Sequence, residues 1–176
     1  RSVGRILDLL ARLGLDENTI VMFSSDNGSI DRVGGHDLPF FEGNGPLRGE
    51  KGQLYEGGIR VPFIARWPGK IKAGTTSDMP IVFYDLLPTL CSIAGAEKPD
   101  RFDGMSFDAT LRGGVQMARD GGLYWEFPSY GGQQAVRMGK WKGIRTGLSK
   151  GPSETQIYDL EADLGDPRDL VLSHGI

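Results

Sequence analysis

The residues best suited to chemistry begin with Asp26 and Asn27, which are separated by Ser25 from the apolar run at residues 19–24. A carboxylate beside an amide carbonyl offers two hard oxygen ligands, which suit Ca²⁺ or Mg²⁺ better than zinc. In open α/β sheets, ligands bind just beyond the carboxyl ends of the strands, where this pair is expected. Ser-Asp-Asn-Gly is also an ordinary turn sequence, so this pattern alone leaves both interpretations open.

Lys51 lies in a glycine-rich segment, residues 45–52, and a lysine in such a loop can approach an anionic oxygen as a point charge. Most lysines are solvated surface residues, and the glycine spacing of a nucleotide-binding P-loop is missing. Arg48 and Arg60 flank the same loop, and we expect each to form a structural ion pair. Arg60 is expected to enter a buried strand, where its charge must be paired.

His36 lies ten residues after Asp26 in the same long loop. It could donate to a substrate oxygen or act as an acid or base, but a structural or surface role fits the position equally well. We assign no role to His174, near the end of the sequence. The single cysteine, Cys91, excludes an internal disulfide and a multi-cysteine zinc site.

The composition describes a water-soluble globular body, with 39% hydrophobic and 24% charged residues among 176. A net charge of −3 argues against a nucleic-acid-binding protein, whose surface is usually basic. No apolar run is long enough to cross a bilayer. The sequence begins with Arg1 in the middle of a helical pattern, which favours a piece of a longer protein.

Hydrophobic periodicity predicts an α/β core in residues 1–110 and a small antiparallel β subdomain in residues 111–176. In the core we expect a helix before Gly14, a helix kinked or broken at Pro88, and two fully buried strands of the kind found in parallel sheets. The predicted core elements are, in order, helix 3–13, strand 19–24, strand 59–67 and helix 81–94. Four short strands are predicted in the subdomain, at residues 123–127, 134–138, 141–145 and 156–160.

A series of sequence blocks then resembles the sulfatase family of the alkaline-phosphatase-like superfamily, in the expected order and over most of the chain. The blocks are FSSDNG (23–28), GPLRGEKG (45–52), YEGGIRVP (55–62), WPGKI (67–71), DLLPTL (85–90), DGMS (103–106), AVRMGKWK (135–142) and IYDL (157–160). The resemblance implies the C-terminal part of a sulfatase fold. Pro128 departs from it, because relatives often carry a polar residue or histidine there.

The resemblance implies roles for the candidate residues. Asp26 and Asn27 would bind Ca²⁺ or Mg²⁺, Lys51 would bind a sulfate oxygen and take part in catalysis, and His36 would contact the substrate. The family nucleophile is a formylglycine made from Cys or Ser in a C/S-x-P-x-R motif. Cys91 is not in such a motif, so the nucleophile is expected outside this chain, and the chain alone is expected to be inactive.

The predicted function is therefore that of a sulfuric ester hydrolase acting on sulfated sugars or small molecules. A phosphodiesterase or phosphonate hydrolase of the same superfamily, and a non-catalytic module that binds sulfated glycans, are the alternatives. The expected partners are the substrate and the N-terminal part of the same protein, with no nucleic acid or membrane. Self-association through an open sheet edge, and export to the periplasm, lysosome or outside of the cell, are also expected.

Overall fold

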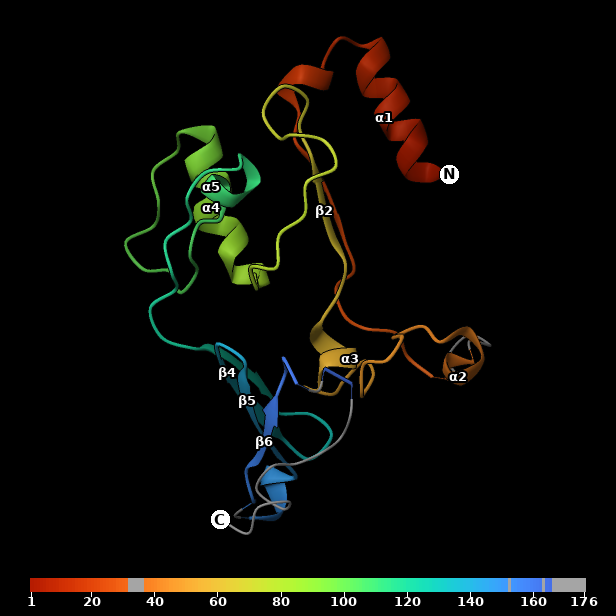
Figure 1. Cartoon of the computed structure of the whole chain (residues 1–176), viewed down its shortest axis with the longest axis vertical. Helices are drawn as coiled ribbons and strands as arrows, with labels where there is room; N and C mark the ends of the chain where they lie inside the picture. The colour runs from red at the N-terminus through yellow and green to blue at the C-terminus, as the bar shows by residue number, and fades with distance from the viewer. Residues whose placement is uncertain (32–36, 152, 163, 166–176) are drawn as a thin grey trace. The chain divides into compact units, whose positions relative to one another are not determined.

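A computed structural model describes residues 1–31, 37–151, 153–162 and 164–165 of the chain (Figure 1). The chain divides into two compact units, each built from separate stretches of sequence. The first unit comprises Arg1–Phe23 and Phe63–Arg119, and the second comprises Ser24–Pro62 and Asp120–Ile176. This division groups the long central loop with the C-terminal region, and the domain boundary between residues 110 and 111 stays a prediction.

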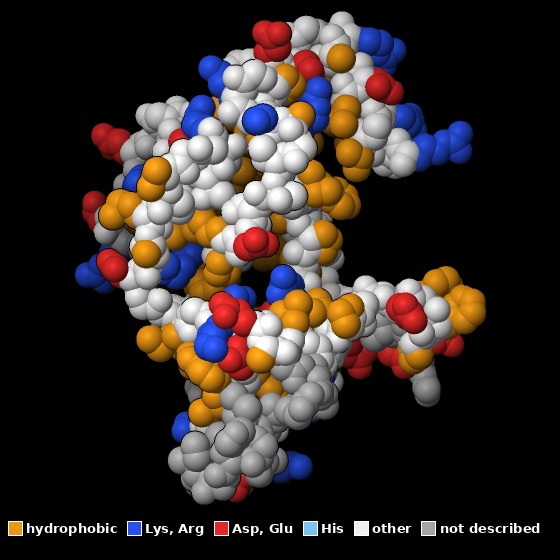
Figure 2. All heavy atoms as spheres, in the orientation of Figure 1, with side chains coloured by type: hydrophobic (Ala, Val, Ile, Leu, Met, Phe, Trp, Pro, Cys, Tyr) orange, Lys and Arg blue, Asp and Glu red, His pale blue; other side chains and the backbone are white. Residues whose placement is uncertain are grey.

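The first unit opens with helix α1 (Ser2–Arg12), which confirms the helix expected before Gly14. Gly14 has a φ of 68°, a left-handed conformation that glycine adopts without strain. The helix has no buried residue. Its apolar side chains are 40–61% exposed at Val3, Ile6, Leu9 and Leu13, and hydrophobic atoms reach the surface over this helix in Figure 2.

Strands β1 (Val21–Ser24) and β2 (Phe63–Arg66) form a two-stranded sheet. The expectation that both strands are fully buried was wrong, because Phe23 is 49% and Ile64 is 61% exposed. Burial of both faces of a sheet requires a covering layer on each side, and an apolar run in a sequence cannot reveal whether the layers are present. Arg66, at the end of β2, pairs with Asp16 in the 3₁₀ turn Asp16–Asn18, with 2.7 Å between Nη1 and Oδ1.

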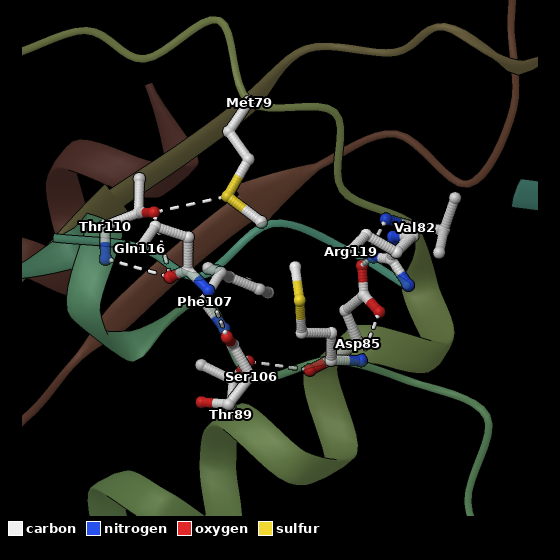
Figure 3. A network of polar contacts seen from close by, with 10 residues as sticks. Met79, Val82, Asp85, Thr89, Ser106, Phe107, Thr110, Gln116 and Arg119 are labelled. Atoms are coloured by element: carbon white, nitrogen blue, oxygen red, sulfur yellow. Dashed lines mark hydrogen bonds and ion pairs between the residues drawn. The ribbon is translucent and has the colours of Figure 1, made fainter. Parts of the chain in front are cut away.

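Asp85 is completely buried. Its carboxylate lies at the centre of a network of polar contacts in the first unit (Figure 3). Its carboxylate accepts hydrogen bonds from the backbone N–H groups of Val82 at 3.0 Å and Met105 at 2.7 Å. It also forms an ion pair with Arg119. The contacts with Met105 and Arg119 join distant loops to the start of a helix, so Asp85 has a structural role.

Asp85 ends the 3₁₀ turn Phe83–Asp85 and precedes helix α4 (Leu86–Ala94). Pro88 does not break α4, because it lies in the first turn of the helix, where its missing N–H would have no intrahelical partner. The predicted kink was therefore wrong, and Gly95 ends the helix as expected, with a φ of 65°. The short helix α5 (Asp108–Leu111) follows and completes this unit.

The second unit contains a four-stranded antiparallel sheet in the order β3-β4-β5-β6, which confirms the predicted C-terminal sheet. Its strands are β3 (Leu123–Phe127), β4 (Gln133–Met138), β5 (Trp141–Thr146) and β6 (Gln156–Asp159). The core of this unit consists of Leu54, Ala135, Ile144, Tyr158 and Leu160. Leu54 comes from the central loop, so the loop completes the core of the sheet.

The central loop itself contains two short helices, α2 (Leu38–Phe41) and α3 (Glu56–Ile59). In Figure 1, α3 lies beside the end of the sheet formed by β4, β5 and β6, and a buried ion pair between Glu56 and Lys142 joins them. A short 3₁₀ turn, Leu148–Lys150, connects β5 to β6. Within the described parts of the chain, no helix has the length and apolar character needed to span a membrane.

Candidate functional site

Asp26 and Asn27 form a tight turn at the end of β1. The Ser25 hydroxyl donates to the Asn27 carbonyl at 2.7 Å, and the Asn27 amide nitrogen donates to the Gly28 carbonyl at 3.1 Å. These bonds leave the Asn27 side-chain oxygen and the exposed Asp26 carboxylate without a protein partner among the described residues. The segment is therefore a turn that also presents two free oxygen ligands.

Lys51 occupies a turn in the central loop, and its side chain is exposed. The turn is closed by a hydrogen bond of 3.0 Å from the Gln53 N–H to the Glu50 carbonyl. Gly52 follows Lys51 with a φ of 88°, as the third position of a type II turn requires. The Lys51 N–H donates to the Ser29 carbonyl at 2.9 Å, so the backbone of Lys51 lies beside the segment that carries Asp26 and Asn27.

Glycines allow these two segments to pack backbone against backbone. The Gly28 N–H donates to the Gly58 carbonyl at 2.9 Å, and a Cβ atom on Gly28 would lie 1.7 Å from the Gly57 carbonyl oxygen. A Cβ on Gly57 would lie 2.2 Å from the Gly49 oxygen, and one on Gly58 would lie 2.0 Å from the Gln53 oxygen. No side chain can fit at these positions, which explains the glycine pair after Glu56.

Sequence reasoning missed Asn44, which links the same segments. Its side-chain oxygen accepts from the Ser29 N–H at 2.8 Å, and its side-chain nitrogen donates to the Gly49 carbonyl at 2.9 Å. Glu50 was also missed, and its carboxylate accepts from the Asp31 N–H at 2.8 Å. The Asn44-Gly45 pair signals a turn, but no local pattern predicts bonds to residues 15 positions away.

An open depression of about 460 Å³ lies over this part of the loop. Acidic and amide side chains contribute to its wall, and they are Asp31, Glu42, Asn44, Glu50 and Gln53. The depression is therefore polar, as a site for a hydroxylated or hydrated ligand would be. Asn44 and Glu50 lie in its wall and also hold the loop in place.

The loop is attached to the C-terminal sheet through polar contacts. The Lys142 ammonium lies 2.6 Å from the Glu56 carboxylate, and their side chains are only 1% and 7% exposed. Burial lowers the pKa of Lys142, although the attraction of Glu56 opposes this shift. The Tyr55 hydroxyl also donates to the Gln156 side chain in β6 at 2.6 Å.

Of the two arginines in the loop that were expected to form ion pairs, only Arg60 forms one among the described residues. Arg48 was predicted to form an ion pair; instead it donates to the Tyr158 hydroxyl at 3.1 Å and stacks 4.1 Å from the centre of the Tyr55 ring. A planar guanidinium suits both contacts. Arg60 does pair with Glu56, at 3.8 Å, but it follows α3 and is half exposed rather than entering a buried strand.

The oxygen atoms of the Asp26 and Asn27 side chains fit part of a site for a divalent cation. In the described part of the chain, no group of three or more His, Cys, Asp or Glu side chains is arranged to hold a metal ion. Ca²⁺ takes about 6–8 oxygen ligands, so Asp26 and Asn27 could supply only some of them. Their free carboxylate and amide oxygens are nevertheless of the hard type that Ca²⁺ and Mg²⁺ prefer.

The remaining candidates from the sequence are His36, His174, Cys91 and Pro128. His36 and His174 lie outside the described residues. Cys91 lies in α4, partly buried, and is a free thiol. Pro128 is exposed, directly after β3.

Family comparisons cover both parts of the chain. Residues 1–96 match the sulfatase family model, and residues 49–172 match the model described as N-sulphoglucosamine sulphohydrolase, C-terminal. Human arylsulfatase A is 38% identical over 195 aligned positions, which cover 97% of this chain and 37% of that protein. Mouse steryl-sulfatase is 39% identical over 138 positions, covering 77% of this chain and 22% of that protein. The chain therefore spans a fifth to about a third of the length of these curated relatives.

Solved structures share the fold. A protein solved in complex with its substrate D-glucosamine-2-N,6-O-disulfate superposes with a TM-score of 0.79 and 25% identity, over 98% of this chain and 34% of that one. The phosphonate monoester hydrolase of Agrobacterium radiobacter superposes with a TM-score of 0.72 and 22% identity, over 98% and 34%. This second likeness shows the alkaline-phosphatase-like fold alone. The family matches and the curated relatives show that the chain belongs to the sulfatase family, of which it forms a C-terminal portion.

Proposed function

We propose that this chain supplies part of the active site of a sulfuric ester hydrolase, with Asp26 and Asn27 holding a divalent cation and Lys51 binding the sulfate group. The supporting observation is the backbone bond of 2.9 Å from Lys51 to Ser29, two residues after Asn27. It brings the loop that carries a free ammonium to the turn that carries two free oxygen ligands. His36 is proposed to contact the substrate on the basis of the family resemblance alone.

The chemistry follows from the charges of these groups. A bound Ca²⁺ or Mg²⁺ would act as a Lewis acid on an oxygen of the sulfate group. The Lys51 ammonium would bind another sulfate oxygen and stabilise the negative charge that develops there during transfer. Because the turn around Lys51 is fixed by bonds on both sides, little reorganisation is needed when the anion arrives.

The substrate class is proposed from the relatives. Several are named for sulfated sugars or steroids, and one solved structure contains a disulfated glucosamine. We propose a sulfated sugar or a small aryl or steroid sulfate as the substrate, and a formylglycine outside this chain as the nucleophile. Phosphonate hydrolysis is less well supported, because the likeness to the phosphonate hydrolase is one of fold alone.

The test is the hydrolysis of aryl sulfate and sulfated glucosamine by the complete protein that contains this chain. Lys51→Ala should lower kcat/KM by about 10²–10³-fold, as loss of one anion-stabilising donor does. Lys150→Ala is the matched control, because it removes an exposed lysine of the same unit that lies in a different turn. Full activity of Lys51→Ala would show that the anion contact is assigned to the wrong residue.

The metal assignment has a separate readout. Asp26→Ala should reduce the bound Ca²⁺ or Mg²⁺ measured by elemental analysis of the purified protein. Asp120→Ala is the control, because it removes an exposed carboxylate of the same unit that does not line the depression. An unchanged metal content in Asp26→Ala would place the cation elsewhere.

Export and self-association are also proposed, from family membership and from the sheet of only two strands in the first unit. Cell fractionation and the mass of the protein in solution would test these two proposals.

A further inference from the structure

The side chain of Gln133 bonds to the backbone on both sides of Gln53, just after Lys51. Gln133 is the first residue of β4 and is 5% exposed. Its side-chain nitrogen donates to the Gly52 carbonyl at 2.8 Å, and its side-chain oxygen accepts from the Leu54 N–H at 3.2 Å. Both ends of one buried amide therefore bond to the loop at positions one and three residues after Lys51.

These bonds fix the turn that carries Lys51 from a second side. On one side, the Lys51 N–H is held by the Ser29 carbonyl at 2.9 Å. On the other side, Gln133 holds Gly52, whose φ of 88° fixes the direction of the turn. The backbone position of Lys51 is therefore determined by residues at 29 and 133, which are far apart in the sequence.

The aromatic ring of Tyr130 adds a steric contact to the same turn. A Cβ atom on Gly52 would lie 2.8 Å from the Tyr130 ring, so the ring packs directly against the backbone of Gly52. Tyr130 itself has a φ of 54°, which is uncommon for a residue other than glycine. The turn is thus contacted by Tyr130, in the β3–β4 connection, and by Gln133, at the start of β4.

A purely structural role for Gln133 would account for its burial, since buried amides are normally hydrogen-bonded. It would not account for the choice of partners. Both bonds of the amide reach the three-residue segment that follows Lys51, although Gln133 is 81 positions from Gly52 in the sequence. An amide that only filled the core could bond anywhere along the sheet.

We propose that Gln133 is a positioning residue for Lys51: its amide holds the turn so that the ammonium meets the sulfate group. This inference rests on the proposed function of Lys51. Gln133 does not touch the substrate, and it acts through the backbone of Gly52 and Leu54.

The test is a double-mutant cycle in the complete protein, with Lys51→Ala, Gln133→Met and the combined variant. Methionine keeps the length and volume of glutamine but cannot form either bond. Gln133→Met should lower kcat/KM for aryl sulfate by about 10²-fold, as a displacement of about 1 Å in a catalytic group can. It should weaken inhibition by inorganic sulfate as well. In the Lys51→Ala background the same change should have less than about a threefold effect, because residues in one network are not additive.

Gln116→Met is the matched control. Gln116 also bridges two backbone groups, accepting from the Thr110 N–H at 3.3 Å and donating to the Ser106 carbonyl at 3.0 Å, but in the other unit. It should lower thermal stability and leave kcat/KM and sulfate inhibition unchanged. If Gln133→Met does not fold, Gln133→Asn replaces it in the cycle, because asparagine keeps the amide but is one methylene too short to make both bonds.

The outcomes separate the two proposals. Full activity of Lys51→Ala would refute the role of Lys51 itself, and with it the inference about Gln133. An impaired Lys51→Ala, combined with an equal loss from Gln133→Met in both backgrounds, would refute only the positioning role. A loss of activity from Gln133→Met that occurs only when Lys51 is present would support the positioning role of Gln133.

Discussion

Replacement of Lys142 by methionine is expected to destabilise the second unit severely. The Lys142 side chain is 1% exposed, and its ammonium lies 2.6 Å from the Glu56 carboxylate, which is 7% exposed. Methionine fills the same space but leaves the carboxylate buried without its partner. Among the described residues, Glu56 also pairs with Arg60, at 3.8 Å, but the Arg60 side chain is half exposed.

The size of the loss follows from the unpaired charge rather than from the attraction within the pair. Removal of one partner from a buried ion pair costs about 3–5 kcal/mol, whereas replacement of both partners is often nearly neutral. We therefore expect a loss of about 3–5 kcal/mol for Lys142→Met, and a smaller loss for the combined Glu56→Gln/Lys142→Met variant.

The pH dependence supplies an independent check. Burial lowers the pKa of Lys142 below its usual 10.5. Between the lowered pKa and 10.5 the unfolded chain binds the proton more tightly than the folded chain, so the contribution of this group to stability increases with pH. Lys142→Met should remove that increase.

The assay is unfolding of the complete protein in urea. The fluorescence of Trp125 offers a local signal, because its ring centre lies 5.6 Å from the Lys142 ammonium. Lys140→Met is the control: Lys140 lies two residues away and pairs with Asp159 at 2.7 Å, but its side chain is 39% exposed. Exposed ion pairs contribute little, so this variant should unfold close to the unmodified protein. An equal loss in Lys140→Met and Lys142→Met would refute the reasoning from burial.

Three further predictions concern the backbone contact, the Asp85 network and acid stability. Gly28→Ala should prevent correct packing of the loop and lower protein yield and thermal stability, because its Cβ would lie 1.7 Å from a backbone oxygen. Gly4→Ala in α1 is the control: its Cβ would meet no atom within 4 Å, so this variant should be tolerated. Asp85→Ala should cost about 3–5 kcal/mol in urea unfolding, because it removes the completely buried carboxylate of an ion pair whose arginine, Arg119, is only 16% exposed. Hydrogen bonding from Lys140 holds the pKa of Asp159 below its usual 3.8, so the stabilisation is present above pH 3.8 and is lost as the pH falls through the lowered pKa. Thermal melts of the protein and of Asp159→Asn from pH 6 to pH 2 should therefore converge at the acid end; a constant separation would contradict this linkage.

Local sequence patterns predicted the regular elements of this chain well. Alternating apolar residues and glycine pairs located all four strands of the C-terminal sheet to within one or two residues. Helical spacing before Gly14 located α1, and the spacing before Gly95 located the end of α4, which begins at Leu86 rather than at residue 81 as expected. Each of these signals depends on neighbours a few positions apart, which a single sequence contains.

The missed features depend on long-range contacts. Arg48 was expected to meet a carboxylate, but its partner, Tyr158, is 110 positions away. Gln133 gave no signal at all, because an amide in a strand is unremarkable until its partners are known. The strand expected at residues 59–67 is shorter in the structure, where β2 spans Phe63–Arg66. Ile59 belongs instead to the helical turn Glu56–Ile59, which the apolar pattern does not reveal.

The contacts of the Lys51 loop imply that the C-terminal sheet does more than cover the core. Besides the apolar packing of Leu54, specific polar bonds link it to the loop: Gln133 to Gly52 and Leu54, Lys142 to Glu56, and Gln156 to Tyr55. Hydrophobic burial would tolerate small shifts of the loop, whereas hydrogen bonds weaken steeply with misalignment and so define a single position. A substitution in β4, β5 or β6 can therefore alter the proposed site without touching a ligand. Its effect should grow with the number of loop bonds that it removes, rather than with the apolar area that it exposes.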